Sequence, residues 1–195
     1  DQFRGWWNSQ IILSQMLFDK KPFDSIMVHG MILDISKKKM SKSLGNITTP
    51  EDVINKYSRD FLRYYLTKFS KSGLDFNYDE NEFQTTKKFV NILKNLETFS
   101  NQIKETNDNS EIEDKWIISK FNSLINEVIE SYNKYDFSGA ISLIEDFTIN
   151  SFSRDYIKLI RDRSDEISGL LNEINMGIYK MISPVMPFLS EMVWS

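Results

Sequence analysis

The chain has 195 residues, 41% hydrophobic and 13% aromatic, which is enough to fill the core of one ordinary domain or two small ones. It contains no cysteine, so disulfides and zinc sites built on thiolates are excluded. No apolar run approaches the roughly 20 residues that cross a bilayer, and no basic and then apolar leader opens the chain. We therefore expect a soluble, cytoplasmic protein with no membrane partner.

The formal net charge of −4 argues against a general nucleic-acid binder, which needs a basic surface. The charge is unevenly distributed, however. Residues 1–66 hold 10 Lys and Arg against 7 Asp and Glu, whereas residues 67–195 hold 14 against 21. Four of the early lysines fall within six positions, and this local positive field is the first indication of a functional site. They are Lys37, Lys38, Lys39 and Lys42.

The first elements in chain order are a helix and a strand. Apolar residues at Trp7, Ile11 and Phe18 have helical spacing. After a turn at residues 21–24, the nearly continuous apolar run over residues 26–33 predicts a parallel-sheet strand buried on both faces. Ligands of such sheets bind beyond the carboxyl ends of the strands, and the lysine-rich segment occupies that position.

The rest of the chain predicts helices. Thr49 and Pro50 are a helix start, a second helix follows from about Ser58, and residues 70–73 read as a linker after which strand signals stop. Amphipathic patterns then predict helices over about 83–103, 116–132, 136–163 and 167–182, with Pro184 and Pro187 ending the last. The predicted fold is mostly helical, with an α/β unit over residues 1–70 and an all-α helical bundle over residues 71–195.

The strongest motif is the segment Lys39-Met40-Ser41-Lys42-Ser43, followed by Leu-Gly-Asn. It resembles the signature loop of class I aminoacyl-tRNA synthetases at all five positions. Amino-acid activation releases pyrophosphate from ATP, and lysine ammonium groups on flexible stems can follow the phosphates as they separate. The bland alternative is a solvated, lysine-rich surface loop, but the predicted buried strand before it and the capped helix after it favour the functional interpretation.

The resemblance implies specific roles. The α/β unit is expected to be the C-terminal edge of a Rossmann-like catalytic domain. The expected substrate is ATP with Mg²⁺, and no zinc is expected in this segment. The two lysines of the motif are the expected catalytic residues, Lys39 and Lys42. The expected ATP-binding residues are His29, Gly30, Lys39, Met40, Ser41, Lys42 and Ser43. Gly45 is expected to let the chain leave the loop without steric penalty.

The opening segment, residues 1–6, reads Asp-Gln-Phe-Arg-Gly-Trp and is similar to a sequence of the isoleucine subgroup of this family. The similarity implies that Asp1 and Gln2 contact the aminoacyl-adenylate and that Trp6 helps to wall the isoleucine pocket. A carboxylate and an amide suit an ammonium and ribose hydroxyls, and an indole is a rigid apolar wall. For Trp7, which lies on the apolar helix face, we expect an ordinary core role instead.

His29 is the only histidine, and taken alone it is more often a hydrogen-bonded structural residue than a catalyst. A chain with one histidine cannot contain the His-Ile-Gly-His-type motif that class I synthetases carry elsewhere in their catalytic domain. We therefore expect an internal or C-terminal fragment of a longer enzyme, without the editing domain and inactive by itself.

The segment over residues 153–163 resembles the basic helix of the family's anticodon-binding domain. Its expected tRNA contacts are Arg154, Lys158 and Arg161, and with Arg163 these residues could form one positive stripe. The alternative is a solvated face whose charges are paired with neighbouring aspartates.

The resemblance thus predicts a segment of the isoleucine enzyme, whose partners are tRNA(Ile), ATP and isoleucine. Alternatives are the valine, leucine or methionine enzymes, or a non-catalytic tRNA-binding module derived from a synthetase. The oligomeric state is left open, with a monomer as the expectation.

Overall fold

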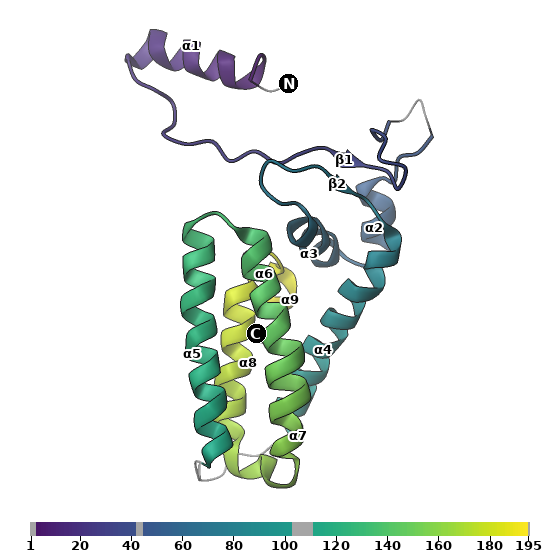
Figure 1. Ribbon diagram of the computed structural model, residues 1–195, viewed down its shortest axis with the longest axis vertical. Coiled ribbons are helices and arrows are strands. Elements are labelled where there is room, and N and C mark those ends of the chain that lie inside the picture. Colours follow the sequence, from purple (N-terminus) through teal and green to yellow (C-terminus); the bar gives the residue numbers. More distant parts are fainter. Residues whose placement is uncertain (1–2, 42–44, 103–110, 195) are drawn as a thin grey trace.

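The computed structural model describes residues 3–41, 45–102 and 111–194, the side chains of residues 102 and 164–166 excepted. A two-stranded sheet and two short helices lie at one end of a helical bundle (Figure 1). Within the described residues, no helix combines the length and the apolar character needed to cross a membrane. The elements are α1 (Trp6–Phe18), β1 (Ile32–Leu33), α2 (Pro50–Lys56), α3 (Arg59–Phe69), β2 (Phe76–Asn77), η2 (Glu80–Glu82), α4 (Phe83–Gln102), α5 (Ile112–Asn133), α6 (Phe137–Asp146), η3 (Phe147–Tyr156), α7 (Ile157–Leu159), η4 (Arg161–Ile167), α8 (Ser168–Ile182) and α9 (Pro187–Trp194).

The helix predicted near the start of the chain is confirmed as α1. It lies apart from the bundle, and an extended segment joins it to β1 (Figure 1). None of its residues is buried, and Met16 is 78% exposed. Apolar periodicity therefore predicted the helix correctly, but no other described element covers its apolar side chains.

The strand predicted over residues 26–33 is mostly wrong. Regular strand structure is confined to β1, and Met31 and Ile32 are exposed rather than buried on both faces. The physical reason is that the described sheet consists of β1 and β2 alone, so neither face is covered as a parallel-sheet interior requires.

The prediction that strand structure ends before residues 70–73 is also wrong, because β2 follows them. β2 pairs with β1 in parallel, with Ile32 opposite Phe76. Two backbone hydrogen bonds flank this register, from Phe76 N to Met31 O at 3.1 Å and from Tyr78 N to Leu33 O at 2.7 Å. The segment over residues 72–78 therefore returns to the segment over residues 28–33, and the domain boundary near residue 70 stays a prediction.

The helix starts predicted at Thr49 and Ser58 are confirmed. Thr49 forms a capping box with Asp52 at the start of α2, and the Ser58 hydroxyl accepts a hydrogen bond from Phe61 N of α3 at 3.1 Å. Next to these helices, rings of Tyr57 just after α2, of α3, of Tyr78 just after β2 and of the start of α4 form a small aromatic core. Its contacts include Tyr57 stacked on Phe61 and a set of edge-on pairs among Tyr57, Phe61, Tyr65, Tyr78 and Phe83.

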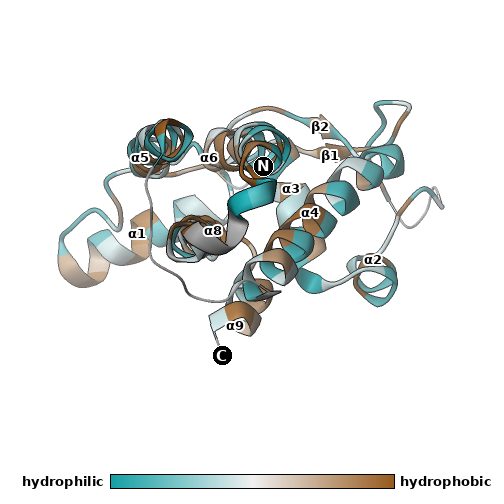
Figure 2. Ribbon diagram, turned by 90° about the horizontal axis from the view of Figure 1, so that it is seen from below, coloured by the Kyte–Doolittle hydropathy of each residue, from teal (hydrophilic) through white to brown (hydrophobic). Residues whose placement is uncertain are grey.

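The predicted all-α bundle is confirmed. Seen from below, α5, α6 and α8 stand beside one another while α4 crosses at an angle (Figure 2). α8 packs against α4, α5 and α6, and one continuous apolar core runs between them. The helix predicted over residues 167–182 ends at Ile182 as expected, and Pro187 then begins α9.

The helix predicted over residues 136–163 continues to Leu159 but changes its hydrogen-bonding pattern on the way. Its central part, η3, is a π-helix, in which backbone bonds span five residues. Phe147, Phe152 and Tyr156 recur at steps of five and four, and all three are buried in the core. The wider turn keeps side chains five residues apart on one face, which an α-helix does not do.

Buried charges attach α3 to the bundle. The Asp60 carboxylate accepts a hydrogen bond from Leu189 N in the first turn of α9 at 2.6 Å, and it also pairs with Arg63. Arg63 Nε in turn donates to Val185 O at 3.0 Å. Farther along α3, Lys68 forms an ion pair of 2.5 Å with Glu145 of α6. These contacts hold the sheet and its loop at one end of the bundle.

Candidate active site

The lysine-rich loop begins in a tight turn directly after β1. Asp34 N donates to Lys38 O at 2.8 Å, and Lys37 N donates to Asp34 O at 2.9 Å. Lys37 has the left-handed backbone conformation, with φ of 60°, and Leu33 and Lys39 then pair as an antiparallel bridge. The turn thus reverses the chain and delivers Lys39 next to the end of β1.

Two side chains hold the base of this loop, and we call them the Asp34–Asn46 clamp. One oxygen of Asp34 accepts from Lys38 N at 2.8 Å, and the other accepts from Asn46 Nδ2 at 2.7 Å. Asn46 Oδ1 accepts from Ser41 N at 2.9 Å, and its Nδ2 also lies 3.4 Å from Lys39 O. The clamp therefore joins Asp34, which precedes the lysine-rich loop, to Asn46, which follows it.

The hydrogen bond from Lys38 N and the one from the Asn46 side chain lower the pKa of Asp34 below its ordinary value of 3.8. Asp34 is therefore ionised at neutral pH. Both of its oxygens accept from N–H groups, while Lys37, Lys38 and Lys39 are exposed. The loop base thus combines a hydrogen-bonded carboxylate with lysine side chains that extend toward solvent.

Met40 lies between two clefts beside the loop. One cleft of about 460 Å³ has polar walls that include Asp34, Asn46 and Asp79. The other, of about 270 Å³, is lined mostly by apolar side chains of β1, α2, α3 and the segment before α2. Met40 and Tyr78 line both clefts, and burial raises the pKa of Tyr78 to about 12, so its hydroxyl stays protonated.

The structure describes only part of the predicted ATP site. Lys39 is exposed, whereas Met40 and Ser41 are half-buried against the clamp. Gly45 has the left-handed conformation, with φ of 64°, which a glycine adopts without the steric penalty that other residues pay. Four predicted residues of this site and of the adenylate site lie outside the described residues, namely Asp1, Gln2, Lys42 and Ser43.

His29 lies farther back along the chain and is exposed. Its Nδ1 is 2.8 Å from the carbonyl oxygen of Gly30, and its backbone forms a bridge with Ser72. Among the hydrogen bonds and bridges of the described residues, none joins His29 to Lys39 or Met40. Its expected place near adenine stays a prediction.

The core role expected for Trp7 is wrong, because no residue of α1 is buried and no other described element covers the apolar side chains of this helix. Trp7 is half-buried and packs edge-on against Phe23, with 5.5 Å between ring centroids. Trp6 is 60% exposed, so its indole is free to contribute to an apolar wall. Its role in an isoleucine pocket stays a prediction.

Gly30 has a structural role that its sequence position did not indicate. A Cβ at this position would lie 2.2 Å from the carbonyl carbon of Leu74. Only glycine therefore allows the backbone over residues 28–33 to approach the segment over residues 72–78 this closely.

Gly30→Ala is expected to open the pairing between these two segments and to destabilise the protein by about 1–3 kcal/mol, since backbone atoms must move apart. The amides of Gly73, Phe76 and Tyr78 donate to the carbonyls of residues 28, 31 and 33. Their hydrogen exchange, measured by NMR, should become faster.

Gly45→Ala is the matched control. Among the described residues, a Cβ at this position meets no atom within 4 Å, so the change costs the backbone strain of a left-handed residue, about 1 kcal/mol. It should leave exchange at Phe76 unchanged. Unchanged exchange in Gly30→Ala would contradict the close approach at Leu74.

The basic segment does not form one continuous stripe. Arg154, Lys158 and Arg161 are exposed, but Arg154 pairs with Asp155 at 3.3 Å. Arg163 turns inward and binds two acidic residues of α5, so its predicted membership of an exposed stripe is wrong. The reason is the kink after α7, where the backbone of Arg163 leaves the helical region.

The inward turn of Arg163 builds a charge network on α5. Arg163 Nη2 lies 2.8 and 2.9 Å from the two oxygens of Asp114 and 2.7 Å from Glu113 Oε1. The Tyr156 hydroxyl donates to Asp114 Oδ1 at 2.7 Å. Asp114 is only 1% exposed, so this network stabilises the bundle and is not available to a ligand.

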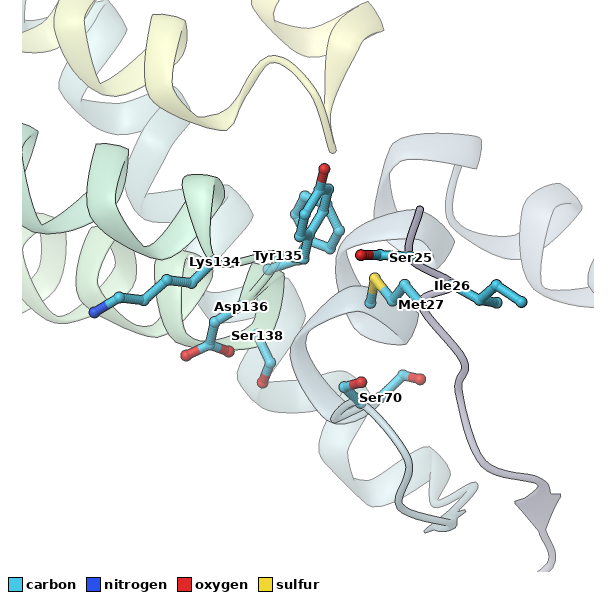
Figure 3. Close-up of a pocket in the computed structure, with 10 residues that line it drawn as sticks. Ser25, Ile26, Met27, Ser70, Lys134, Tyr135, Asp136 and Ser138 are labelled. Atoms are coloured by element: carbon cyan, nitrogen blue, oxygen red, sulfur yellow. The ribbon is translucent and has the colours of Figure 1, made fainter. Parts of the chain in front are cut away.

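A third cleft, of about 440 Å³, lies where residues 25–27 and 70–72 face the turn between α5 and α6 (Figure 3). Two of its polar groups are bonded within the protein: Asp136 Oδ1 accepts from Gly139 N, and Ser138 Oγ donates to Lys68 O. Figure 3 shows the Lys134 side chain pointing away from residues 25–27. The cleft therefore offers little to a phosphate group.

Asp34 and Asn46 are the site residues that sequence reasoning did not assign. Asn46 follows the lysine motif within the family-like Leu-Gly-Asn, which was a usable signal. Asp34 is a single carboxylate after an apolar run, and nothing local indicates that it meets a side chain 12 residues away.

Two family models match the chain: tRNA synthetases class I (I, L, M and V) over residues 1–79, and the anticodon-binding domain of tRNA ligases over residues 114–195. The chain belongs to the class I tRNA synthetases, and the fold predicted from its sequence is confirmed. Its similar curated relatives are isoleucine–tRNA ligases. That of Methanosarcina barkeri is 35% identical over 98% of this chain, that of Methanococcus maripaludis 36% over 100%, and that of Petrotoga mobilis 33% over 100%.

The chain spans about one fifth of the length of these relatives, 20% of the first two and 23% of the third. Among solved structures, a LeuRS from Agrobacterium radiobacter K84 in complex with tRNA and LeuAMS matches 95% of this chain and 24% of its own, with a TM-score of 0.76 and 21% identity. The Mycobacterium tuberculosis methionyl-tRNA synthetase bound by methionyl-adenylate matches 86% of this chain and 37% of its own, with a TM-score of 0.72 and 20% identity. At these identities, the two structures establish the fold alone.

Proposed function

We propose that the longer protein to which this chain belongs activates isoleucine with ATP and transfers it to tRNA(Ile). Isoleucine and ATP would form isoleucyl-adenylate and pyrophosphate, and the isoleucyl group would then pass to the terminal ribose of the tRNA. The main support is the lysine loop, which leaves β1 through a fixed turn in a chain whose relatives are isoleucine–tRNA ligases. The substrates belong to translation, and we place the activity in the cytoplasm.

In this proposal, Lys39 and Lys42 act on the phosphates of ATP, which is bound as its Mg²⁺ complex. Negative charge grows on the phosphate oxygens as pyrophosphate leaves, so an ammonium held nearby stabilises the transition state more than the ground state. Ser41, Ser43 and backbone N–H groups would hold the loop or bond phosphate oxygens. Met40, His29 and Gly30 would lie near the adenine.

The adenylate and tRNA contacts would come from two separate parts of the chain. Asp1 and Gln2 would hold the ammonium and ribose hydroxyls of the adenylate, and Trp6 would form part of the isoleucine pocket. On the bundle, the exposed Arg154, Lys158 and Arg161 would contact the tRNA backbone. Because the bundle is acidic, we expect these contacts to orient tRNA rather than to supply most of its affinity.

The test uses a protein of the relatives' length that contains this chain, hereafter the longer enzyme. ATP–pyrophosphate exchange is measured with isoleucine, valine, leucine and methionine, and aminoacylation is measured with a tRNA(Ile) transcript. We expect the highest kcat/KM with isoleucine and charging of tRNA(Ile). A higher value with another of the four would assign that amino acid instead. Tight tRNA binding without any exchange would indicate a non-catalytic tRNA-binding module.

A further inference from the structure

The Asp34–Asn46 clamp holds three points of the loop backbone that lie close to Lys39. It bonds the N–H of Lys38, the N–H of Ser41 and, at 3.4 Å, the carbonyl of Lys39. Asp34 makes the first of these bonds and Asn46 makes the other two, and a contact of 2.7 Å links the two side chains. Removing Asp34 therefore releases the N–H of Lys38 before Lys39, and removing Asn46 releases the carbonyl of Lys39 and the N–H of Ser41 after it.

The Lys39 side chain is exposed, so the backbone decides where its ammonium group starts from. The flexible stem allows the ammonium to follow a phosphate, but only within its own reach. A displacement of about 1 Å at a reacting group can lower a rate on the order of 100-fold, because geometry held in advance lowers the barrier. The clamp fixes the backbone on which that geometry depends.

We propose that Asp34 and Asn46 are positioning residues that align Lys39 with the phosphates of ATP in the activation step. This inference rests on the proposed function. Neither side chain needs to touch ATP. Asp34 fixes the turn before Lys39, and Asn46 fixes Ser41 after it, so together they hold the intervening backbone from both sides.

The hydrogen-bond pattern allows a reciprocal exchange of the two residues. In Asp34→Asn, two amides face each other, and one N–H of the backbone or of the partner amide loses its acceptor. In Asn46→Asp, two carboxylates face each other and repel. In the double variant, Asn at 34 can accept from Lys38 N and donate to Asp at 46, which can accept from Ser41 N. Only the long contact to Lys39 O is lost.

The experiment compares both single variants and the double variant in the longer enzyme. We expect each single change to lower kcat of isoleucine-dependent pyrophosphate exchange on the order of 10- to 100-fold, with little change in the KM for isoleucine. The double variant should recover to within about fivefold of the unchanged enzyme, which is strongly non-additive. Asp24→Asn is the control, because Asp24 pairs with Lys21 outside the loop and is exposed.

A second readout separates the clamp from the proposed function. Hydrogen exchange by mass spectrometry over residues 35–46 should become faster in each single variant and slow again in the double variant. If the unchanged enzyme shows no pyrophosphate exchange with isoleucine, the proposed function fails. Hydrogen exchange over these residues would still test the clamp. The positioning role would be overturned if the losses of kcat were additive in the double variant. It would also be overturned if the single variants kept the full kcat. If hydrogen exchange over these residues were unchanged in the single variants, the two side chains would not hold the loop backbone.

Discussion

Replacing Lys39 by alanine in the longer enzyme is expected to lower the rate of isoleucine activation by about two to three orders of magnitude. The removed ammonium opposes charge that develops only as pyrophosphate leaves, and a single donor aimed at such charge typically supplies that much. The KM for isoleucine should stay nearly unchanged, because the amino acid binds elsewhere. Steady-state exchange at varied isoleucine and ATP concentrations separates the two effects.

Lys38→Ala is the matched control for this prediction. Lys38 is also exposed, and its backbone makes the same turn, but its side chain lies outside the five-residue motif. If the lysines act only through a general positive field, the two alanine variants should lose similar activity, and both losses should shrink as salt rises. If Lys39 meets the phosphates directly, its loss should be far larger and should persist at high salt. Equal, salt-sensitive losses would remove Lys39 from the catalytic residues.

Asp114→Ala is expected to destabilise the bundle by about 3 kcal/mol. Asp114 is almost fully buried, and its carboxylate accepts bonds from Arg163 and Tyr156. Its removal leaves the half-buried Arg163 with Glu113 as its remaining acidic partner, and an uncompensated buried charge is costly. Urea unfolding followed by circular dichroism measures the change in the free energy of unfolding.

The stability lost in Asp114→Ala should decrease as the pH falls. Burial by itself raises the pKa of Asp114, but hydrogen bonds from Arg163, Tyr156 and the Glu111 N–H outweigh it, so the folded pKa lies below 3.8. The stabilisation is therefore fully present above the ordinary pKa of about 4 and is lost as the pH falls through the folded value. The difference between the unchanged chain and Asp114→Ala should shrink below pH 4.

Asp155→Ala serves as the exposed counterpart. Its ion pair with Arg154 is largely solvated, so the change should cost less than about 1 kcal/mol at any pH. Asp114→Asn keeps the shape of the side chain and loses its charge. Its destabilisation should lie between those of Asp114→Ala and Asp155→Ala. Equal destabilisation by Asp114→Ala and Asp155→Ala would contradict a structural role for the buried network.

The amino-acid sequence determined the local features of this protein. The starts of α2 and α3 follow from Thr49 and Ser58, because a capping side chain bonds backbone N–H groups only two or three residues away. The bundle follows from apolar residues at helical spacing, and the lysine motif indicated its family because its chemistry lies in five consecutive residues. The role of Gly45 at the exit of the loop was also predictable, since a left-handed backbone favours glycine at that single position.

Only the tertiary structure decided the features that join distant residues. The return of β2 to β1 spans more than 40 residues, and neither strand is long enough to carry a clear pattern of its own. The kink that turns Arg163 toward Asp114 likewise has no signal in residue spacing. The lysines of the loop were visible from the sequence, but the clamp that holds them required the fold, because Asp34 and Asn46 meet only after the chain reverses between them.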